Sequence, residues 1–181
     1  MMQTNRFKLL VVSLVLATTA CTNDVALLEK TSATGDAFTN NLTKEYRKLA
    51  RYEAREMVDW PDADRFAAKG LATARGIAVR PERPEDWRTP DNAMADLKTG
   101  HRRLVAILET GVRSGAPQTA AAAQARFDCW VEQQEENWQV EHIAACRSAF
   151  RQALADLENS PEVQAARFTM VLFPFDSARI T

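Results

Sequence analysis

Residues 120–161 read AAAAQARFDCWVEQQEENWQVEHIAACRSAFRQALADLENSP and contain two helical patterns. Residues 120–136 begin with four alanines, which are strong helix formers, and continue with bulky apolar residues suited to packing. A second helical pattern covers residues 141–157 and is closed by Asn-Ser-Pro. The two patterns predict an antiparallel helical hairpin with its turn between Asn137 and Trp138.

Two cysteines lie in this hairpin, Cys129 and Cys146, at equal distances from the predicted turn. On one continuous helix their Cα atoms would be about 25 Å apart, whereas a disulfide needs about 7 Å or less. Residues equally far from a hairpin turn lie level with each other. The sequence therefore predicts a Cys129–Cys146 disulfide, which the loop-entropy model values at about 3 kcal/mol.

Apolar residues at spacings of three and four also predict helices earlier in the chain. The expected helices cover about 36–57, 62–76 with Asp62 as the cap, and 90–110. Residues 79–92 contain three prolines and are expected to form a loop. The fold class is therefore an all-α bundle of about five helices over residues 36–160, preceded by a flexible linker at 21–35.

Residues 1–20 have the composition of an export signal. Arg6 and Lys8 precede the apolar run 9–16, and small residues follow at 17–20. The run is far shorter than the roughly 20 residues needed to span a bilayer. Without this segment, residues 21–181 carry 21 basic and 24 acidic side chains, a net charge of about −3. This balance argues against nucleic acid as a partner, because phosphate binding relies on a basic surface.

Cys21 follows the small residues directly, and with Leu16 and Ala20 it resembles the lipobox of bacterial lipoproteins. The resemblance implies that the thiol is acylated with fatty acids such as palmitate and becomes the first residue of the mature protein. Thr22, in place of the Asp that retains such proteins in the inner membrane, implies the periplasmic face of the outer membrane. An ordinary cleaved signal with a chance cysteine is the alternative. Acylation of Cys21 would leave Cys129 and Cys146 to pair with each other.

The sequence offers no set of residues typical of catalysis, and we expect no enzymatic activity, cofactor or metal. Asp128, Glu132, Glu135 and Glu136 are interpreted as a solvated charged helix face. His101 is expected in the core or at its boundary, and with His142 it forms no zinc set beside the cysteines. Four tryptophans could form a ligand-stacking surface, but packing at helix ends and turns explains them equally well: Trp60, Trp87, Trp130 and Trp138.

The C-terminal residues 161–181 differ from the helical body. Residues 168–175 are aromatic and β-branched, which predicts a strand. Residues 171–181, with Phe173, Phe175, Asp176 and Ser177, resemble the first strand of the OmpA-like peptidoglycan-binding domain. Residues 127–130 and 143–147 also look like the region that precedes this domain in some envelope lipoproteins. A strand or tail belonging to the helical domain is the alternative.

The resemblance implies an OmpA-family outer-membrane lipoprotein with a structural, envelope-tethering role. It is anchored in outer-membrane lipid through Cys21 and carries only the start of the peptidoglycan-binding domain, within residues 161–181. Peptidoglycan would be bound only by a full-length form, because the family's ligand-binding Asp and Arg lie beyond the first strand. The alternative function is that of an adaptor lipoprotein whose helical bundle binds a periplasmic protein partner of an envelope complex. An enzyme or ligand carrier would need a deep pocket with convergent polar groups.

Overall fold

The computed structural model describes residues 24–165, and this part of the chain contains helices and no strand. In chain order its elements are α1 (Asp24–Lys30), α2 (Ala37–Tyr52), the π-helical turn η1 (Glu53–Met57), α3 (Trp60–Ala74), the 3-10 turn η2 (Pro84–Asp86), α4 (Asp91–Leu108), α5 (Val112–Gly115), α6 (Pro117–Glu136) and α7 (Val140–Glu158). The all-α prediction is confirmed, and α2, α3, α4, α6 and α7 are the five predicted helices. The predicted strand at 168–175 lies outside the described residues, as do Cys21 and the export signal.

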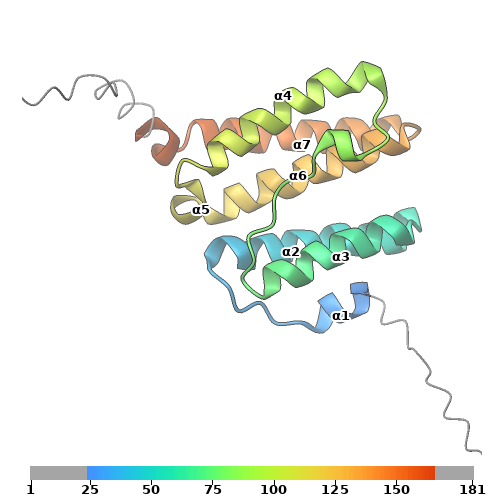
Figure 1. Ribbon diagram of the computed structural model, residues 1–181, viewed down its shortest axis with the longest axis horizontal. Coiled ribbons are helices and arrows are strands. Elements are labelled where there is room, and N and C mark those ends of the chain that lie inside the picture. Colours follow the sequence, from blue (N-terminus) through green and yellow to red (C-terminus); the bar gives the residue numbers. More distant parts are fainter. Residues whose placement is uncertain (1–23, 166–181) are drawn as a thin grey trace, which may run out of the picture.

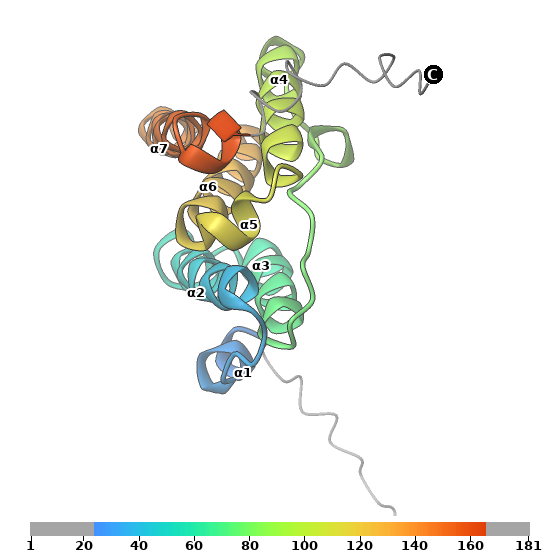
Figure 2. The same cartoon turned by 90° about the vertical axis from the view of Figure 1, so that its left-hand side faces the viewer.

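The helices form two stacked antiparallel hairpins, α2–α3 and α6–α7 (Figure 1). Helix α4 packs on the α6–α7 hairpin, and α1 packs against α3 on the opposite side of the molecule (Figure 2). Because α2 and α6 run in the same direction, the α2–α3 turn and the α6–α7 turn lie at the same end of the molecule (Figure 1).

The α6–α7 hairpin has the turn that the sequence predicts. Asn137 ends α6 in the left-handed region with φ 53°, a conformation that asparagine tolerates better than most residues. Cys129 and Cys146 form the predicted disulfide, with their Cα atoms 5.7 Å apart. The cross-link joins α6 to α7 and holds the hairpin closed.

The α2–α3 hairpin begins at Asp36, whose carboxylate accepts a 2.7 Å hydrogen bond from the Thr39 backbone N–H. The chain leaves η1 through Val58, which has φ 59°, and α3 is capped by Asp59. The prediction that Asp62 caps α3 is therefore wrong by one turn. Pro61 is tolerated in the first turn of α3, because backbone N–H groups in a first turn make no hydrogen bond within the helix and the missing N–H of proline costs nothing there.

Helix α1 lies where the sequence predicts part of a flexible linker, and that prediction is wrong for residues 24–30. Leu28 is fully buried against α3, where Gly70 leaves room for it. The Arg47 guanidinium donates hydrogen bonds to the backbone carbonyl oxygens of Leu28 and Thr31 at 2.8–3.2 Å. Seven residues are too few for helical periodicity to stand out, so the tertiary contacts that order this segment were not visible in the sequence.

Aromatic side chains join α4, α6 and α7. The Phe127 ring lies 5.0 Å from Phe150 and 6.1 Å from Trp130, between ring centroids. Gly100 of α4 faces these rings, and a Cβ atom there would lie 2.9 Å from Phe150. His101 is half-buried beside Phe127, as predicted for a boundary histidine, and burial lowers its pKa.

Candidate functional site

A buried polar network centred on Asp128 links α6 to three other parts of the fold. Asp128 is fully buried and accepts three hydrogen bonds. Their donors are the Tyr46 hydroxyl at 2.7 Å, the Lys69 ammonium at 2.6 Å and the Glu82 backbone N–H at 2.8 Å. Burial raises the pKa of Asp128, while Lys69 opposes this by stabilising the carboxylate.

Glu82, in the loop before η2, completes the network. Its carboxylate accepts hydrogen bonds from Arg65 and Lys69 of α3 at 2.7 and 2.8 Å, and from the Trp87 indole at 3.0 Å. Burial alone would raise the pKa of Glu82, but the bonds from Arg65 and Lys69 outweigh it and lower the pKa to about 2. The charges in this network are partnered, so its arrangement is that of a structural clamp.

A second group of carboxylates lies at the end of the molecule where the α2–α3 and α6–α7 turns meet. Glu53 and Glu132 are both fully buried there, so the prediction that Glu132 and Asp128 lie on a solvated face is wrong. Neither oxygen of Glu53 has a hydrogen-bond partner within the described chain. Glu132 accepts hydrogen bonds from the Gln133 side chain next to it, the shorter at 3.0 Å.

The pKa values of three carboxyl groups in this cluster are raised. Burial, with the neighbouring charge of Glu136, raises the pKa of Glu53 to about 8. Burial and the charge of Glu53 raise the pKa of Glu132 to about 9. Burial also raises the pKa of Asp62 to about 6. We call the carboxyl groups gathered at this end of the molecule the acidic end, and its members are Glu53, Asp59, Asp62, Glu132, Glu135 and Glu136.

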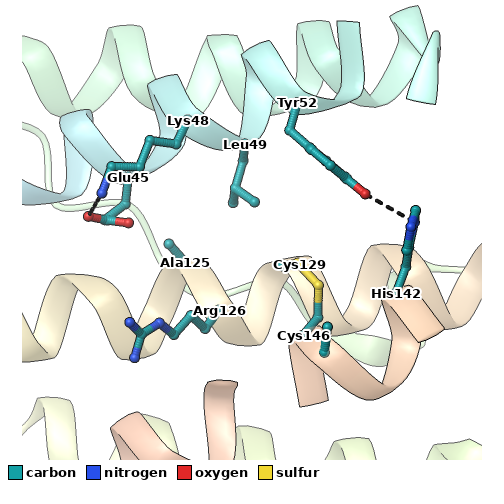
Figure 3. A pocket seen from close by; sticks show the side chains of 10 residues that line it. Glu45, Lys48, Leu49, Tyr52, Ala125, Arg126, Cys129, His142 and Cys146 are labelled. Carbon is teal, nitrogen blue, oxygen red and sulfur yellow. Dashed lines mark hydrogen bonds and ion pairs between the residues drawn. A yellow bond between two sulfur atoms is a disulfide. The ribbon is translucent and has the colours of Figure 1, made fainter. Parts of the chain in front are cut away.

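A groove of about 460 Å³ lies between α2 and the α6–α7 hairpin (Figure 3). Leu49 projects into it from α2, and Ala125 and the Cys129–Cys146 disulfide form the facing wall. We call it the disulfide groove. Its lining is mainly apolar, so it fits an aliphatic or aromatic group better than a charged one.

Four polar side chains of the disulfide groove are paired with each other, and Arg126 also lines it. The Tyr52 hydroxyl lies 3.0 Å from His142 Nδ1, and Lys48 forms an ion pair with Glu45 at 2.7 Å (Figure 3). Burial and nearby carboxylates raise the pKa of Tyr52, which keeps its hydroxyl protonated. Because the two sulfur atoms are bonded to each other, neither is a free thiol nucleophile.

The other predicted site residues are dispersed. Trp130 is buried in the aromatic cluster, and Trp87 is half-buried beside Glu82. Trp60 and Trp138 are instead exposed at the two turns. No group of three or more His, Cys, Asp and Glu side chains in residues 24–165 is placed to hold a metal ion. Phe173, Phe175, Asp176 and Ser177 lie outside the described residues, as does the lipidation candidate Cys21.

Comparison of the chain with models of protein families, with curated proteins and with solved structures finds no match. The resemblance to OmpA-family lipoproteins therefore rests on the quoted residues alone.

The acidic end was not predicted from the sequence, because its carboxylates come from two segments that are far apart in the chain. Glu53 lies 79 positions before Glu132 in the chain. One signal was present: the apolar positions of α2 continue through residue 53, so a carboxylate lies in line with core side chains. That pattern indicates a buried acid but does not name its neighbours.

Proposed function

We propose that this chain is a non-enzymatic, lipid-anchored lipoprotein of the OmpA family, located on the periplasmic face of the outer membrane. The distribution of the three cysteines carries the proposal. Cys129 and Cys146 are joined in the helical body, which leaves Cys21, in its lipobox position, as the remaining cysteine. A disulfide that stabilises a domain is typical of exported proteins and rare in a reducing cytosol.

A lipid anchor would supply the membrane attachment in this proposal. None of the helices within residues 24–165 is long and apolar enough to cross a bilayer. Several acyl chains on one cysteine hold a protein at a membrane, because each buried CH₂ contributes about 0.8 kcal/mol. The helical body would then act as a spacer or interaction module beyond the anchor.

Metabolic labelling with an alkyne analogue of palmitate tests the anchor. The full chain is expected to take up the label and to sediment with outer membranes, whereas a Cys21→Ser chain does neither. A Cys129→Ser, Cys146→Ser chain is the matched control and is expected to keep the label. Labelling that persists in the Cys21→Ser chain contradicts the proposal.

Tethering to peptidoglycan is the second part of the proposal and rests on the resemblance of residues 171–181. It applies to a form in which residues 171–181 continue into a complete OmpA-like domain. A pull-down on purified peptidoglycan is expected to retain such a form and not the chain of 181 residues. Strong retention of the 181-residue chain shows that the assignment of the binding residues is wrong.

An adaptor function is the alternative, and one observation favours it. Large apolar side chains are exposed at the two adjacent turns: Val58 at 67%, Trp60 at 47%, Trp138 at 69% and Val140 at 71%. We call these four residues the apolar turns. Exposed aromatic residues gathered at one place are typical of surfaces that bind another protein.

A further inference from the structure

The apolar turns and the acidic end occupy the same end of the molecule. The Tyr52 hydroxyl at the end of α2 lies 3.0 Å from His142 in the first turn of α7, which brings the two turns together. Val58 and Trp60 follow Tyr52 closely in the chain, and Trp138 and Val140 precede His142. Apolar side chains and carboxylates thus lie together at the two turns.

At this end of the described chain, acidic side chains outnumber basic ones. Residues 53–62 and 132–141 hold eight Asp or Glu side chains, one arginine and no lysine. The ion pairs of the described chain involve other carboxylates. Glu135 and Glu136 are half-buried and Glu141 is exposed, so a cation in solvent can approach these carboxylates.

We propose that the apolar turns and the acidic end together bind a basic amphipathic segment of a protein partner. The partner's apolar side chains cover Trp60 and Trp138, and its Lys or Arg side chains neutralise the surrounding carboxylates. This inference rests on the adaptor function proposed above and names the chemistry of the partner. Buried aromatic anchors within a charged rim are the usual source of affinity in such interfaces.

The acidic charge of the surface favours a basic partner segment over a second copy of the chain or an anionic lipid surface. A second copy of the chain would bring one acidic end against another, and like charges in contact are unfavourable. An anionic lipid surface would be repelled by the same carboxylates. Only a cationic partner satisfies both the apolar and the charged parts of the surface.

The geometry of the α2–α3 turn is consistent with a binding role. Val58 has φ 59°, a strained conformation for a β-branched residue, and it follows a π-helical turn. Both features are more frequent at functional sites than elsewhere. The Val58 side chain is 67% exposed to solvent.

The test uses the full mature chain in phosphatidylcholine nanodiscs and a fluorescent amphipathic helical peptide of leucine and lysine as the probe. The matching leucine–glutamate peptide and empty nanodiscs are the blanks. Fluorescence anisotropy is expected to show binding of the lysine peptide that weakens as salt rises, because screening reduces the attraction between the opposite charges. The glutamate peptide is expected not to bind.

Two pairs of variants locate the surface. Trp138→Ala with Val140→Ala is expected to weaken binding of the lysine peptide by about tenfold or more. Its matched control, Leu27→Ala with Ile77→Ala, removes two exposed apolar side chains elsewhere and is expected to change binding less than about twofold.

A second pair of double variants, which remove carboxylate charges, follows the same design. Glu135→Gln with Glu136→Gln is expected to weaken binding and flatten its salt dependence, whereas Asp86→Asn with Glu109→Gln is not. Equal losses in the control variants overturn the inference, as does equal binding of the glutamate peptide. Self-association of the chain that Trp138→Ala abolishes also overturns it, because the occupant is then a second copy. If Cys21 is not acylated, the same titration runs in solution, so failure of the anchor and failure of the surface are distinguishable.

Discussion

The substitution Glu53→Gln keeps the shape of a fully buried side chain and removes its ability to ionise. In the folded chain the pKa of Glu53 is raised from 4.5 to about 8, chiefly by burial. Below pH 4.5 the carboxyl is protonated in both the folded and the unfolded chain. Above that pH the unfolded chain releases the proton while the folded chain retains it, so the free energy of unfolding falls until the folded pKa is passed.

The size of the effect follows from the shift. Each pKa unit corresponds to about 1.4 kcal/mol, so a rise from 4.5 to about 8 sets an upper limit near 5 kcal/mol. Because η1 lies at a turn, water can reach the ionised carboxylate after a small movement and relieve part of this cost. We therefore expect the Glu53→Gln chain to be about 2 to 3 kcal/mol more stable than its parent at pH 8. At pH 5 we expect the two chains to be nearly equal.

Urea unfolding followed by circular dichroism between pH 5 and pH 8 measures this difference. The parent is residues 21–181 with Cys21→Ser, which prevents acylation. Glu141→Gln changes an exposed glutamate near the same turn and is the matched control for the lost charge. A stability difference between the Glu53→Gln chain and its parent that does not grow with pH refutes the reasoning, as does a Glu53→Gln chain that is less stable at pH 8.

Three further variants test the packing of the body, each by chemical unfolding at pH 7. Asp128→Ala removes the acceptor of three buried donors and is expected to lower the free energy of unfolding by about 3 kcal/mol or more; a loss below about 1 kcal/mol contradicts the clamp. Cys129→Ser with Cys146→Ser is expected to lower it by about 3 kcal/mol, and an unchanged value indicates that the bond does not form in solution. Gly100→Ala places a Cβ atom 2.9 Å from Phe150 and is expected to cost about 1 to 3 kcal/mol; a stabilised variant disproves this contact.

The long helices were predictable from the sequence because each carries its own periodic apolar face. The disulfide was predictable for a related reason: Cys129 and Cys146 are placed symmetrically about a turn that Asn137 marks. Helix α1 was not predictable in this way. Its order depends on Gly70 and Arg47, which come from distant parts of the chain.

The burial of Asp128 and Glu132 could not be predicted from the pattern of residues along the chain. Asp128 and Glu132 follow each other at helical spacing and have the appearance of a solvated face, yet both are buried. Asp128 is buried because Lys69 and Tyr46 meet it from α3 and α2. Glu132 lies one turn further along the same face of α6, where Glu53 of η1 is close enough to raise its pKa. Which face of α6 is covered depends on how the two hairpins stack, and that arrangement is a property of the whole fold.

Intact mass spectrometry of the protein purified from membranes without reductant tests the lipid anchor and the disulfide in one experiment. We expect a chain that begins at Cys21, carries the added mass of its acyl groups, and lacks two hydrogens because Cys129 and Cys146 are joined. A chain that retains residues 1–20, lacks acyl mass on Cys21, or reacts at both body cysteines with a thiol reagent contradicts this expectation.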